Sequence, residues 1–270
     1  TFLRDHGIPC ADFHVVNNAG ELAAAVEALG TPCVLKTCTL GYDGKGQIKI
    51  EGPRDWERLW SEFGAERGVL EKWIPFDCEV SVICARSADG AVETFPMAEN
   101  IHRHHILHAS VVPARVGPRI EREGRELAIA VAEQLGLTGL VAVEMFVTSD
   151  GLLVNELAPR PHNSGHYTQD ACRPSQFEQH VRAVAGLPLL EPALLTPVVM
   201  VNLLGDIWQE GEPDWACALA EPRAHLHLYD KGEPRAGRKM GHLNVTADEL
   251  PRALALAEAL YRRLGGREPF

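Results

Sequence analysis

Two apolar segments, each carrying one glutamate, flank a short turn in the middle of the chain. Residues 141–147 and 152–156 are rich in Val, Leu and Phe, which favour strands, and Ser149-Asp150-Gly151 between them favours a tight turn. The pattern predicts an antiparallel hairpin. If the turn has three residues with glycine in the left-handed position, the register places Glu144 directly opposite Glu156 on one face of the sheet.

Facing carboxylates need a reason to persist. Like charges opposite each other across a strand ladder are destabilising, unless a cation bridges them or one of them binds a proton. Hard divalent ions such as Mg²⁺, or Mn²⁺ in its place, take carboxylate oxygens and leave room for phosphate and water. The sequence therefore predicts a metal site at Glu144 and Glu156. A pair of exposed charges is the alternative.

A loop that is unusually dense in polar side chains follows the second strand. It contains an arginine, two histidines, an asparagine, a serine and a threonine, punctuated by proline and glycine, between residues 158 and 168. Polar groups concentrated on a loop after a strand are typical of a binding or catalytic site. A solvated loop with helix-capping residues is the simpler alternative.

A glycine-rich segment, Gly41-Tyr42-Asp43-Gly44-Lys45-Gly46-Gln47, lies between two predicted strands, 32–37 and 48–50. Glycines at a hairpin tip permit positive φ and close backbone approach, so such a tip can close over phosphates. It is no P-loop, because a strand follows it and the Lys-Ser/Thr pair is missing. Lys36 lies on the preceding buried strand with no acidic residue adjacent, so we expect it to need an anionic ligand.

A basic turn is predicted near the end of the chain. Lys231, Arg235, Arg238 and Lys239 occur among glycines in an otherwise acidic chain. Such a turn suits a phosphate group, for which arginine can supply bidentate contacts. A solvated turn remains the alternative.

Composition excludes several classes of function. The net charge of −11 argues against nucleic acid as a partner, and 46% apolar residues in 270 supply a substantial core. No apolar run approaches the roughly 18 residues of a membrane-spanning helix, and no signal peptide is evident. Seven scattered cysteines without a Cys-x-x-Cys pair predict reduced core thiols and a cytoplasmic protein. The chain starts inside an apolar pattern, so we expect it to be a piece of a longer protein.

Two further features are ambiguous from the residues alone. Glu79 is either a charge on an edge strand or an acceptor for a ribose hydroxyl. The histidine-rich segment 102–108 invites a zinc interpretation, which the absence of a fixed Cys/His pattern disfavours.

Several segments occur together in an order that resembles a known family. They are Lys36, residues 41–47, Glu71-Lys72-Trp73, Glu99-Asn100-x-His102, Asn155-Glu156-Leu157-Ala158-Pro159-Arg160, His162-Asn163-Ser164-Gly165-His166 and Gly237-Arg238-Lys239-Met240-Gly241-His242. The chain resembles the 5-(carboxyamino)imidazole ribonucleotide synthases, ATP-grasp enzymes of purine synthesis, over nearly its whole length. The fifth and sixth segments are the most specific.

The resemblance implies an α+β chain with the ATP-grasp fold and a small β-rich C-terminal domain. It divides the chain into a lid subdomain with the glycine-rich flap (1–75), a central subdomain with the metal and bicarbonate site (76–190), and a C-terminal domain that contributes to phosphate binding (191–270). It also implies a homodimer.

The implied reaction is the ATP-dependent carboxylation of 5-aminoimidazole ribonucleotide with bicarbonate, through carboxyphosphate. ATP would be bound by Lys36 at the phosphates, by the flap residues Gly41, Tyr42, Asp43, Gly44, Lys45, Gly46 and Gln47, by Glu71, Lys72, Trp73 and Ile74 along the adenine, by Glu79 at the ribose, and by His102, Asn155 and Glu156. Mg²⁺ would be held by Glu144 and Glu156.

The remaining roles concern the other two substrates. Arg160, His162 and Asn163 would face bicarbonate and the reacting amine, while Ser164, Lys231 and Arg238, with Tyr42 and Lys45 from the flap, would hold the ribonucleotide. Members of the family begin with a further domain of roughly a hundred residues, and we expect that domain to be missing from this chain. Two alternatives therefore stay open: another ATP-grasp carboxylate–amine ligase, and a nucleotide-binding module without turnover.

Overall fold

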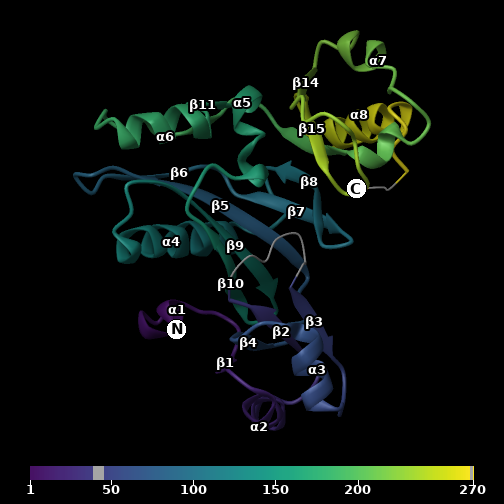
Figure 1. Cartoon of the computed structure of the whole chain (residues 1–270). Coiled ribbons are helices and arrows are strands. Elements are labelled where there is room, and N and C mark those ends of the chain that lie inside the picture. Colours follow the sequence, from purple (N-terminus) through teal and green to yellow (C-terminus); the bar gives the residue numbers. More distant parts are fainter. Residues whose placement is uncertain (39–45, 268–269) are drawn as a thin grey trace.

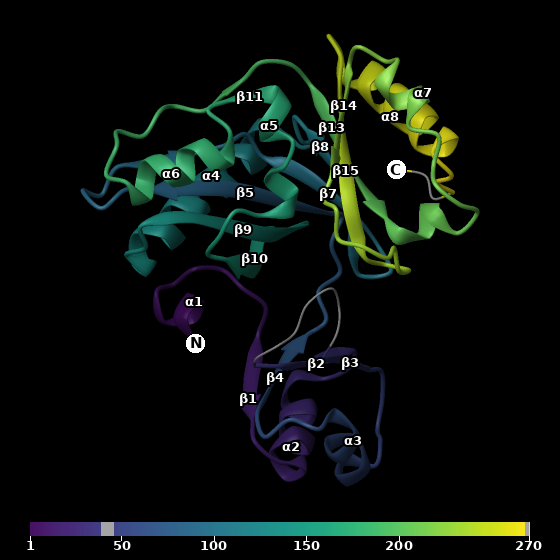
Figure 2. The same ribbon diagram turned by 45° about the horizontal axis from the view of Figure 1, so that its top comes forward.

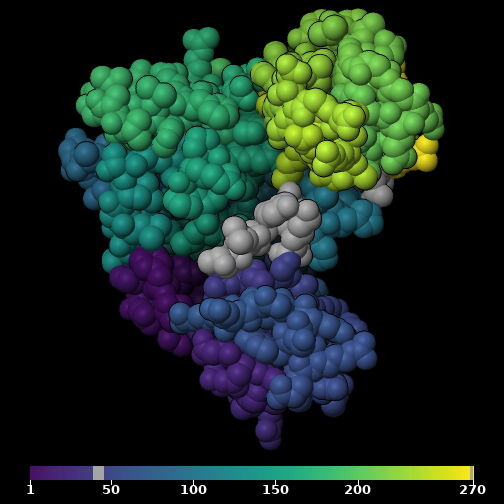
Figure 3. Space-filling view, viewed as in Figure 1, coloured from purple at the N-terminus to yellow at the C-terminus, as the bar shows by residue number. Residues whose placement is uncertain are grey.

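The structure, a computed structural model, describes residues 1–38, 46–267 and 270. A small N-terminal lobe lies beneath a larger body, and the C-terminal part of the chain projects from that body (Figures 1 and 3). No helix in the described ranges is both long enough and apolar enough to cross a membrane. All seven cysteines are free thiols, and four of them are buried.

The small lobe is one four-stranded sheet covered by two helices. The strands follow the order β1-β4-β2-β3, and α2 and α3 pack on the sheet over a core that includes Leu22, Leu35 and Leu70. Its elements are β1 (Phe13–Val16), α2 (Ala19–Leu29), β2 (Cys33–Thr37), β3 (Gln47–Ile50), α3 (Trp56–Phe63) and β4 (Gly68–Lys72). The preceding helix α1 (Phe2–Asp5) packs instead against the core of the larger body.

Local signals in the sequence explain where the helices of this lobe begin. The side chain of Asn18 accepts a hydrogen bond from the backbone N–H of Glu21 at 2.8 Å, and the Glu21 carboxylate accepts one from the N–H of Asn17 at 2.9 Å. This reciprocal capping satisfies N–H groups that a helix leaves unpaired at its start.

The larger body is built on a nine-stranded sheet with the order β10-β9-β5-β7-β8-β13-β15-β14, in which β6 pairs with β5. Neighbouring strands along this path are antiparallel. The strands are β5 (Cys78–Arg86), β6 (Val92–Thr94), β7 (Ala98–Arg103), β8 (Ile106–Val112), β9 (Gly139–Thr148), β10 (Gly151–Ala158), β13 (Val198–Leu204), β14 (Ala224–Leu228) and β15 (Lys239–Thr246).

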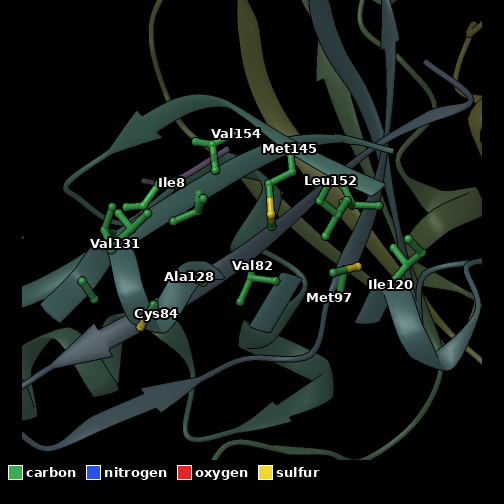
Figure 4. Close-up of a cluster of buried hydrophobic side chains, with 14 of the residues drawn as sticks. Ile8, Val82, Cys84, Met97, Ile120, Ala128, Val131, Met145, Leu152 and Val154 are labelled. Carbon is green, nitrogen blue, oxygen red and sulfur yellow. The ribbon is translucent and has the colours of Figure 1, made fainter. Parts of the chain in front are cut away.

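Helices cover both faces of the central strands (Figures 1 and 2). On one face α4 (Pro118–Leu135) packs over a core that contains Val82, Val131 and Met145, shown in Figure 4. The opposite face carries a second core, with Ile83 and Ala142, beneath α5 and α6. The elements on that side are η1 (Asn163–Gly165), α5 (Thr168–Ala171), β11 (Cys172–Arg173), α6 (Gln176–Val184) and β12 (Ala193–Leu194).

The C-terminal strands continue the central sheet. β13 pairs with β8, so the sheet runs without a break from the central part into residues 198–246. The helical elements η2 (Gly205–Trp208), α7 (Ala216–Leu219) and α8 (Leu250–Arg263) pack with these strands over a third core. The division at residue 190 into two domains stays a prediction.

Candidate active site

The hairpin of β9 and β10 differs from the expected one at its turn. Thr148 pairs with Gly151, so the turn has two residues and not three. Continued to the end of the strand, that pairing would place Val143, and not Glu144, opposite Glu156. The predicted turn is therefore wrong, yet Glu144 does pair with Glu156.

A β-bulge restores the facing of the two glutamates. The register shifts by one residue between Val154 and Glu156, which leaves Asn155 as the extra residue. Before the bulge, Leu152 and Val154 point into the core under α4. After it, residues of the same parity point to the opposite face, because one inserted residue reverses the alternation of a strand. The bulge thus brings Glu156 to the face that Glu144 occupies.

Glu144 is the end of a chain of polar contacts that starts on the neighbouring strand. Ser81, opposite Glu144 in β5, donates from Oγ to Ser164 Oγ at 2.8 Å. Ser164 Oγ lies 2.9 Å from His162 Nδ1, and His162 Nε2 lies 3.1 Å from Glu144 Oε1. The backbone N–H of Ser164 also donates to His162 Nδ1. Because an N–H can only donate, Nδ1 is the unprotonated nitrogen, and Nε2–H faces the carboxylate.

The pKa values of Glu144 and His162 are both shifted in the direction that disfavours the charged form. Burial, followed by the nearby Glu156 carboxylate, raises the pKa of Glu144 to about 7. Burial, followed by the cationic Arg160 and Lys239, lowers the pKa of His162 to about 3. His162 is therefore a neutral donor near pH 7, whereas Glu144 ionises fully only when a cation offsets its surroundings.

The residues present fit a hard divalent ion. Two oxygen donors face each other, burial and the second carboxylate raise the pKa of one of them, and His162 already orients its carboxylate, as supporting hydrogen bonds do at metal sites. Across the described residues, no group of three or more His, Cys, Asp or Glu side chains gathers at one point. Such a pair leaves the other positions around an ion open to phosphate and water.

Glu79 and His102 lie on the same face of the sheet, further along β5 and β7. His102 Nδ1 is 3.0 Å from Glu79 Oε1. Burial alone would lower the pKa of His102, but the contact with Glu79 and the charge of Glu144 outweigh it, so the pKa is raised. The structure therefore pairs the two residues that the resemblance assigned to the ribose and its surroundings.

Lys36 has an acidic neighbour that the sequence did not reveal. Its Nζ lies 2.6 Å from Glu71 Oε2, on the adjacent strand β4, and 3.5 Å from Asn155 Oδ1. The expectation that no acidic residue is near Lys36 is wrong, because strand pairing joins residues far apart in the sequence. The lysine nevertheless reaches from the small lobe to the bulged residue of β10.

The flap lies mostly outside the described residues: Gly41, Tyr42, Asp43, Gly44 and Lys45 fall in that gap. Gly46 and Gln47 are described. Gly46 has a φ of +75°, and its carbonyl accepts from the N–H of Thr37 at 2.9 Å.

The segment proposed to line the adenine follows the end of β4. The N–H groups of Lys72 and Trp73 donate to the carbonyls of Asp12 and Pro32. The Trp73 ring is 38% exposed and carries the Lys49 ammonium 4.3 Å from its centroid. Ile74 follows at the connection to the large sheet.

Arg160 and Asn163 occupy the loop after β10. Arg160 is exposed, and its Nη1 donates to the Pro161 carbonyl at 3.1 Å. Asn163 exchanges two amide hydrogen bonds with the buried Asn202, at 2.9 and 2.7 Å. This pairing ties the loop to β13, whereas the arginine side chain bonds within its own loop.

The predicted basic turn connects β14 to β15. Lys231 Nζ donates to the Lys239 carbonyl at 3.0 Å and lies 4.9 Å from the centroid of the Tyr229 ring. Arg238 Nη1 donates to the Glu233 carbonyl at 3.2 Å. Lys239 is close enough to influence both Glu144 and His162, so the turn adds positive charge to the same face.

Sequence reasoning missed a polar network beside this face. Asp170 Oδ2 accepts from His227 Nε2 at 2.8 Å and from Asn244 Nδ2 at 2.6 Å. Burial would raise the pKa of Asp170, but these hydrogen bonds outweigh it and lower the pKa. It also missed Gln176, which is fully buried against the loop. No local sequence motif identifies such residues, because their partners lie on strands and loops that are distant in the sequence.

Comparisons with known proteins agree with this architecture. The model of the ATP-grasp domain matches residues 1–177, and that of the phosphoribosylaminoimidazole carboxylase C-terminal domain matches residues 198–255. The N5-carboxyaminoimidazole ribonucleotide synthase of Bacillus subtilis is 50% identical over 242 residues, which cover 89% of this chain and 63% of that protein. The Vibrio vulnificus enzyme of the same name is 42% identical over 270 residues, covering 96% and 70%. The chain thus spans about two thirds of these relatives.

Solved structures match the fold over almost the whole chain. An ADP complex of an N5-carboxyaminoimidazole ribonucleotide synthetase is 46% identical with a TM-score of 0.88, covering 96% of this chain and 68% of its own. The Aspergillus clavatus synthase in complex with ADP and 5-aminoimidazole ribonucleotide is 33% identical with a TM-score of 0.87, covering 97% and 70%. The expected ATP-grasp fold is confirmed, and the chain belongs to the N5-carboxyaminoimidazole ribonucleotide synthase family.

Proposed function

We propose that this chain carries the ATP-dependent carboxylation of 5-aminoimidazole ribonucleotide to N5-carboxyaminoimidazole ribonucleotide, with release of ADP and phosphate. The observation that carries the proposal is the sheet face on which Glu144 meets Glu156 beside the loop of Arg160, His162 and Asn163. Relatives named as complexes with ADP and with the ribonucleotide share this fold.

ATP would lie between the small lobe and the large sheet. Lys36 supports this place for the phosphates, because its ammonium already reaches Asn155, the bulged residue of β10. Glu71, Lys72, Trp73 and Ile74 would line the adenine where β4 leaves the small lobe, and Glu79 with His102 would hold the ribose.

Glu144 and Glu156 would hold Mg²⁺, or Mn²⁺ in its place. When bound, the ion would neutralise charge on the phosphates of ATP during transfer. His162 would donate from Nε2 to Glu144 and so keep that carboxylate oriented toward the ion.

Bicarbonate would be activated between Arg160, His162 and Asn163. A bicarbonate oxygen attacks the γ-phosphorus of ATP, the bond to ADP breaks, and carboxyphosphate forms. The amine nitrogen of the ribonucleotide then bonds to the carboxyl carbon, phosphate leaves, and the amine loses a proton. Carboxyphosphate is strongly anionic, so the exposed guanidinium of Arg160 suits its oxygens, while the pKa of His162 keeps that ring neutral.

The ribonucleotide would extend from this loop to the basic turn. Lys231 and Arg238 would bind its 5′-phosphate, with Tyr42 and Lys45 contributing from the flap. Ser164 would act through its buried hydroxyl, which is engaged with Ser81 and His162, and so would shape the pocket from beneath.

A coupled assay of ADP release tests the proposed reaction. With ATP, Mg²⁺ and bicarbonate present, we expect the ribonucleotide to stimulate ADP release and to be consumed in equal amount. Equal stimulation by another amine or carboxylate substrate, without an effect of the ribonucleotide, would assign the chain to another ATP-grasp ligase. Binding of Mg·ATP with no turnover would identify a nucleotide-binding module.

We also propose that the protein is a cytoplasmic homodimer. The support is a group of exposed apolar side chains on α6 and the segment after it, namely Phe177, Val181, Val184, Leu187, Leu190 and Leu195. An antiparallel pairing of two α6 helices would bury these side chains.

A further inference from the structure

The side chain of Gln176 is fully buried, and its hydrogen bonds go to the loop that carries His162 and His166. Its Oε1 accepts from the His162 N–H at 2.9 Å, and its Nε2 donates to the His162 carbonyl at 2.8 Å. The same Nε2 lies 3.0 Å from His166 Nδ1. A Cβ at Gly165 would come within 2.7 Å of Oε1, so glycine is what lets the amide approach.

These contacts fix the tautomer of His166. A backbone N–H can only donate, so the amide atom that faces the His162 N–H must be the oxygen. The other amide atom is then the NH₂ group, which can only donate. His166 Nδ1 must therefore accept, and in the neutral ring the proton is on Nε2.

The surroundings of His166 keep the ring neutral. Burial, followed by the charges of His227, Lys239, Lys231 and Arg160, lowers the pKa of His166 to about 4. The ring also packs against His242 and Phe177, with centroids 4.9 and 5.6 Å away. Among residues 1–38, 46–267 and 270, Nε2 of His166 has no hydrogen-bond partner.

His166 lies between the two ends of the proposed ribonucleotide site. Through Gln176 it is joined to His162, at the bicarbonate end. On its other side the ring meets Tyr229 edge-on at 6.3 Å, and Tyr229 carries the ammonium of Lys231, at the phosphate end. A ligand that spans the two ends would pass this ring.

We propose that His166 is a ribonucleotide-binding residue whose Nε2–H donates to an acceptor on the ribose or base, and that Gln176 is the positioning residue that fixes this tautomer. The inference rests on the proposed function for the identity of the ligand. The tautomer itself does not depend on that function.

Nitrogen-15 NMR of the histidine rings in the substrate-free protein determines which nitrogen of His166 carries the proton. We expect His166 to carry its proton on Nε2 in the wild type and on Nδ1 in Gln176→Glu, where a carboxylate would accept from it. A wild-type ring protonated at Nδ1, or an unchanged ring in Gln176→Glu, would overturn the positioning role whether or not the protein turns over.

Steady-state kinetics with a matched control variant test whether His166 binds the ribonucleotide. Gln179 is equally buried in α6 but bonds to Leu190, so Gln179→Glu introduces the same charge without facing His166. We expect Gln176→Glu and His166→Ala to raise the KM for the ribonucleotide about three- to tenfold, the value of one neutral hydrogen bond, with little change in the KM for ATP. His166→Gln, which keeps a donor near Nε2, should recover part of the loss.

Two kinetic results would contradict the binding role. One is an equal rise in both KM values in Gln176→Glu and Gln179→Glu, which would indicate general damage to α6. The other is a His166→Ala enzyme with a wild-type KM for the ribonucleotide. If the wild type shows no response to the ribonucleotide at all, the proposed function and the ligand assignment fail together, while the NMR result for the tautomer stands.

Discussion

At the scale of single residues, the candidate site disfavours the charged forms of two of its own side chains, Glu144 and His162. The pKa of Glu144 is raised to about 7 and that of His162 is lowered to about 3, with burial as the leading cause of both shifts. Both groups are thus held in conditions that disfavour their charged forms. A divalent ion and the phosphates of ATP would supply the charges that this arrangement lacks.

This arrangement predicts that Glu144→Gln stabilises the metal-free protein in a pH-dependent manner. The folded-state pKa of about 7 exceeds the ordinary value of 4.5, so the contribution of Glu144 to stability is fully present below about pH 4.5 and is lost as the pH rises through about 7. Gln has no such loss. Thermal unfolding in EDTA should give the variant an advantage of about 2–3 kcal/mol at pH 8 and little at pH 5.

The exposed Asp150→Asn, in the turn of the same hairpin, serves as the control and should show no pH-dependent gain. Added Mg²⁺ should stabilise the wild type but not Glu144→Gln, and the variant should lose Mg²⁺-dependent turnover. A variant less stable than the wild type at pH 8 would contradict the assigned environment of Glu144.

Arg238→Ala should impair binding of the ribonucleotide more than binding of ATP. The Arg238 guanidinium donates to the Glu233 carbonyl within its own turn, and in the variant Lys231 would be the remaining basic residue of the turn assigned to the 5′-phosphate. A lost charge-assisted contact of about 1.5–3 kcal/mol corresponds to a rise in KM of roughly ten- to a hundredfold. Steady-state kinetics measure both KM values, and a selective rise in the KM for ATP would assign the turn to the nucleotide instead.

At the scale of secondary-structure elements, a single inserted residue decides the geometry of the site. Without the bulge at Asn155, Glu156 would point into the core under α4. With the bulge, Glu156 lies on the same face of the sheet as Glu144. The same extra residue directs Asn155 toward Lys36 of the small lobe. One irregularity in a strand therefore positions groups from both parts of the molecule.

Gly46, the residue before β3, should not tolerate a side chain. Its φ is +75°, and a Cβ would lie 2.5 Å from Thr37 Oγ1, so Gly46→Ala should cost about 1–3 kcal/mol of folding free energy. Gly52→Ala is the control, since a Cβ there meets nothing within 4 Å, and it should change stability by less than about 0.5 kcal/mol. Urea unfolding measures both, and equal effects would show that the hairpin does not require glycine at position 46.

The hairpin also shows how far the sequence determines the site. Strand propensity and the positions of the two glutamates predicted that Glu144 and Glu156 face each other, and they do so because the bulge at Asn155 offsets the error in the assumed turn. A bulge has no reliable local signature, because the extra residue is selected by packing on both faces. Likewise Glu71 could not be identified as the partner of Lys36, and Gln176 could not be connected to His166, before the chain was folded.

At the scale of the whole molecule, a continuous sheet joins the loop of Arg160, His162 and Asn163 to the basic turn. β5, β7, β8, β13 and β15 lie side by side, so residues that hold the two ends of the proposed ribonucleotide site belong to one rigid element. The small lobe, whose strand β2 carries Lys36, lies below this sheet in Figure 2. This layout suits a ligand fixed on the sheet and a nucleotide enclosed from the small lobe.

The proposed dimer predicts a change in mass for a variant of α6. Val181 is 57% exposed in the middle of the apolar group, and Val181→Glu would place a charge in the paired interface, so the protein should become monomeric. Leu219→Glu, at a 71% exposed position on α7, introduces the same charge elsewhere and should stay dimeric. Light scattering after gel filtration distinguishes the two. A wild-type monomer, or a dimeric Val181→Glu, would exclude this interface.

The most direct test of the proposed chemistry follows one oxygen atom. In the carboxyphosphate route, an oxygen of bicarbonate bonds to the γ-phosphorus and stays with phosphorus when the carboxyl carbon is captured. With ¹⁸O-labelled bicarbonate, ATP and 5-aminoimidazole ribonucleotide, mass spectrometry should find one ¹⁸O in each released phosphate. Glu156→Gln should form no labelled phosphate. Unlabelled phosphate released together with carboxylated ribonucleotide would contradict the phosphorylation of bicarbonate by this site.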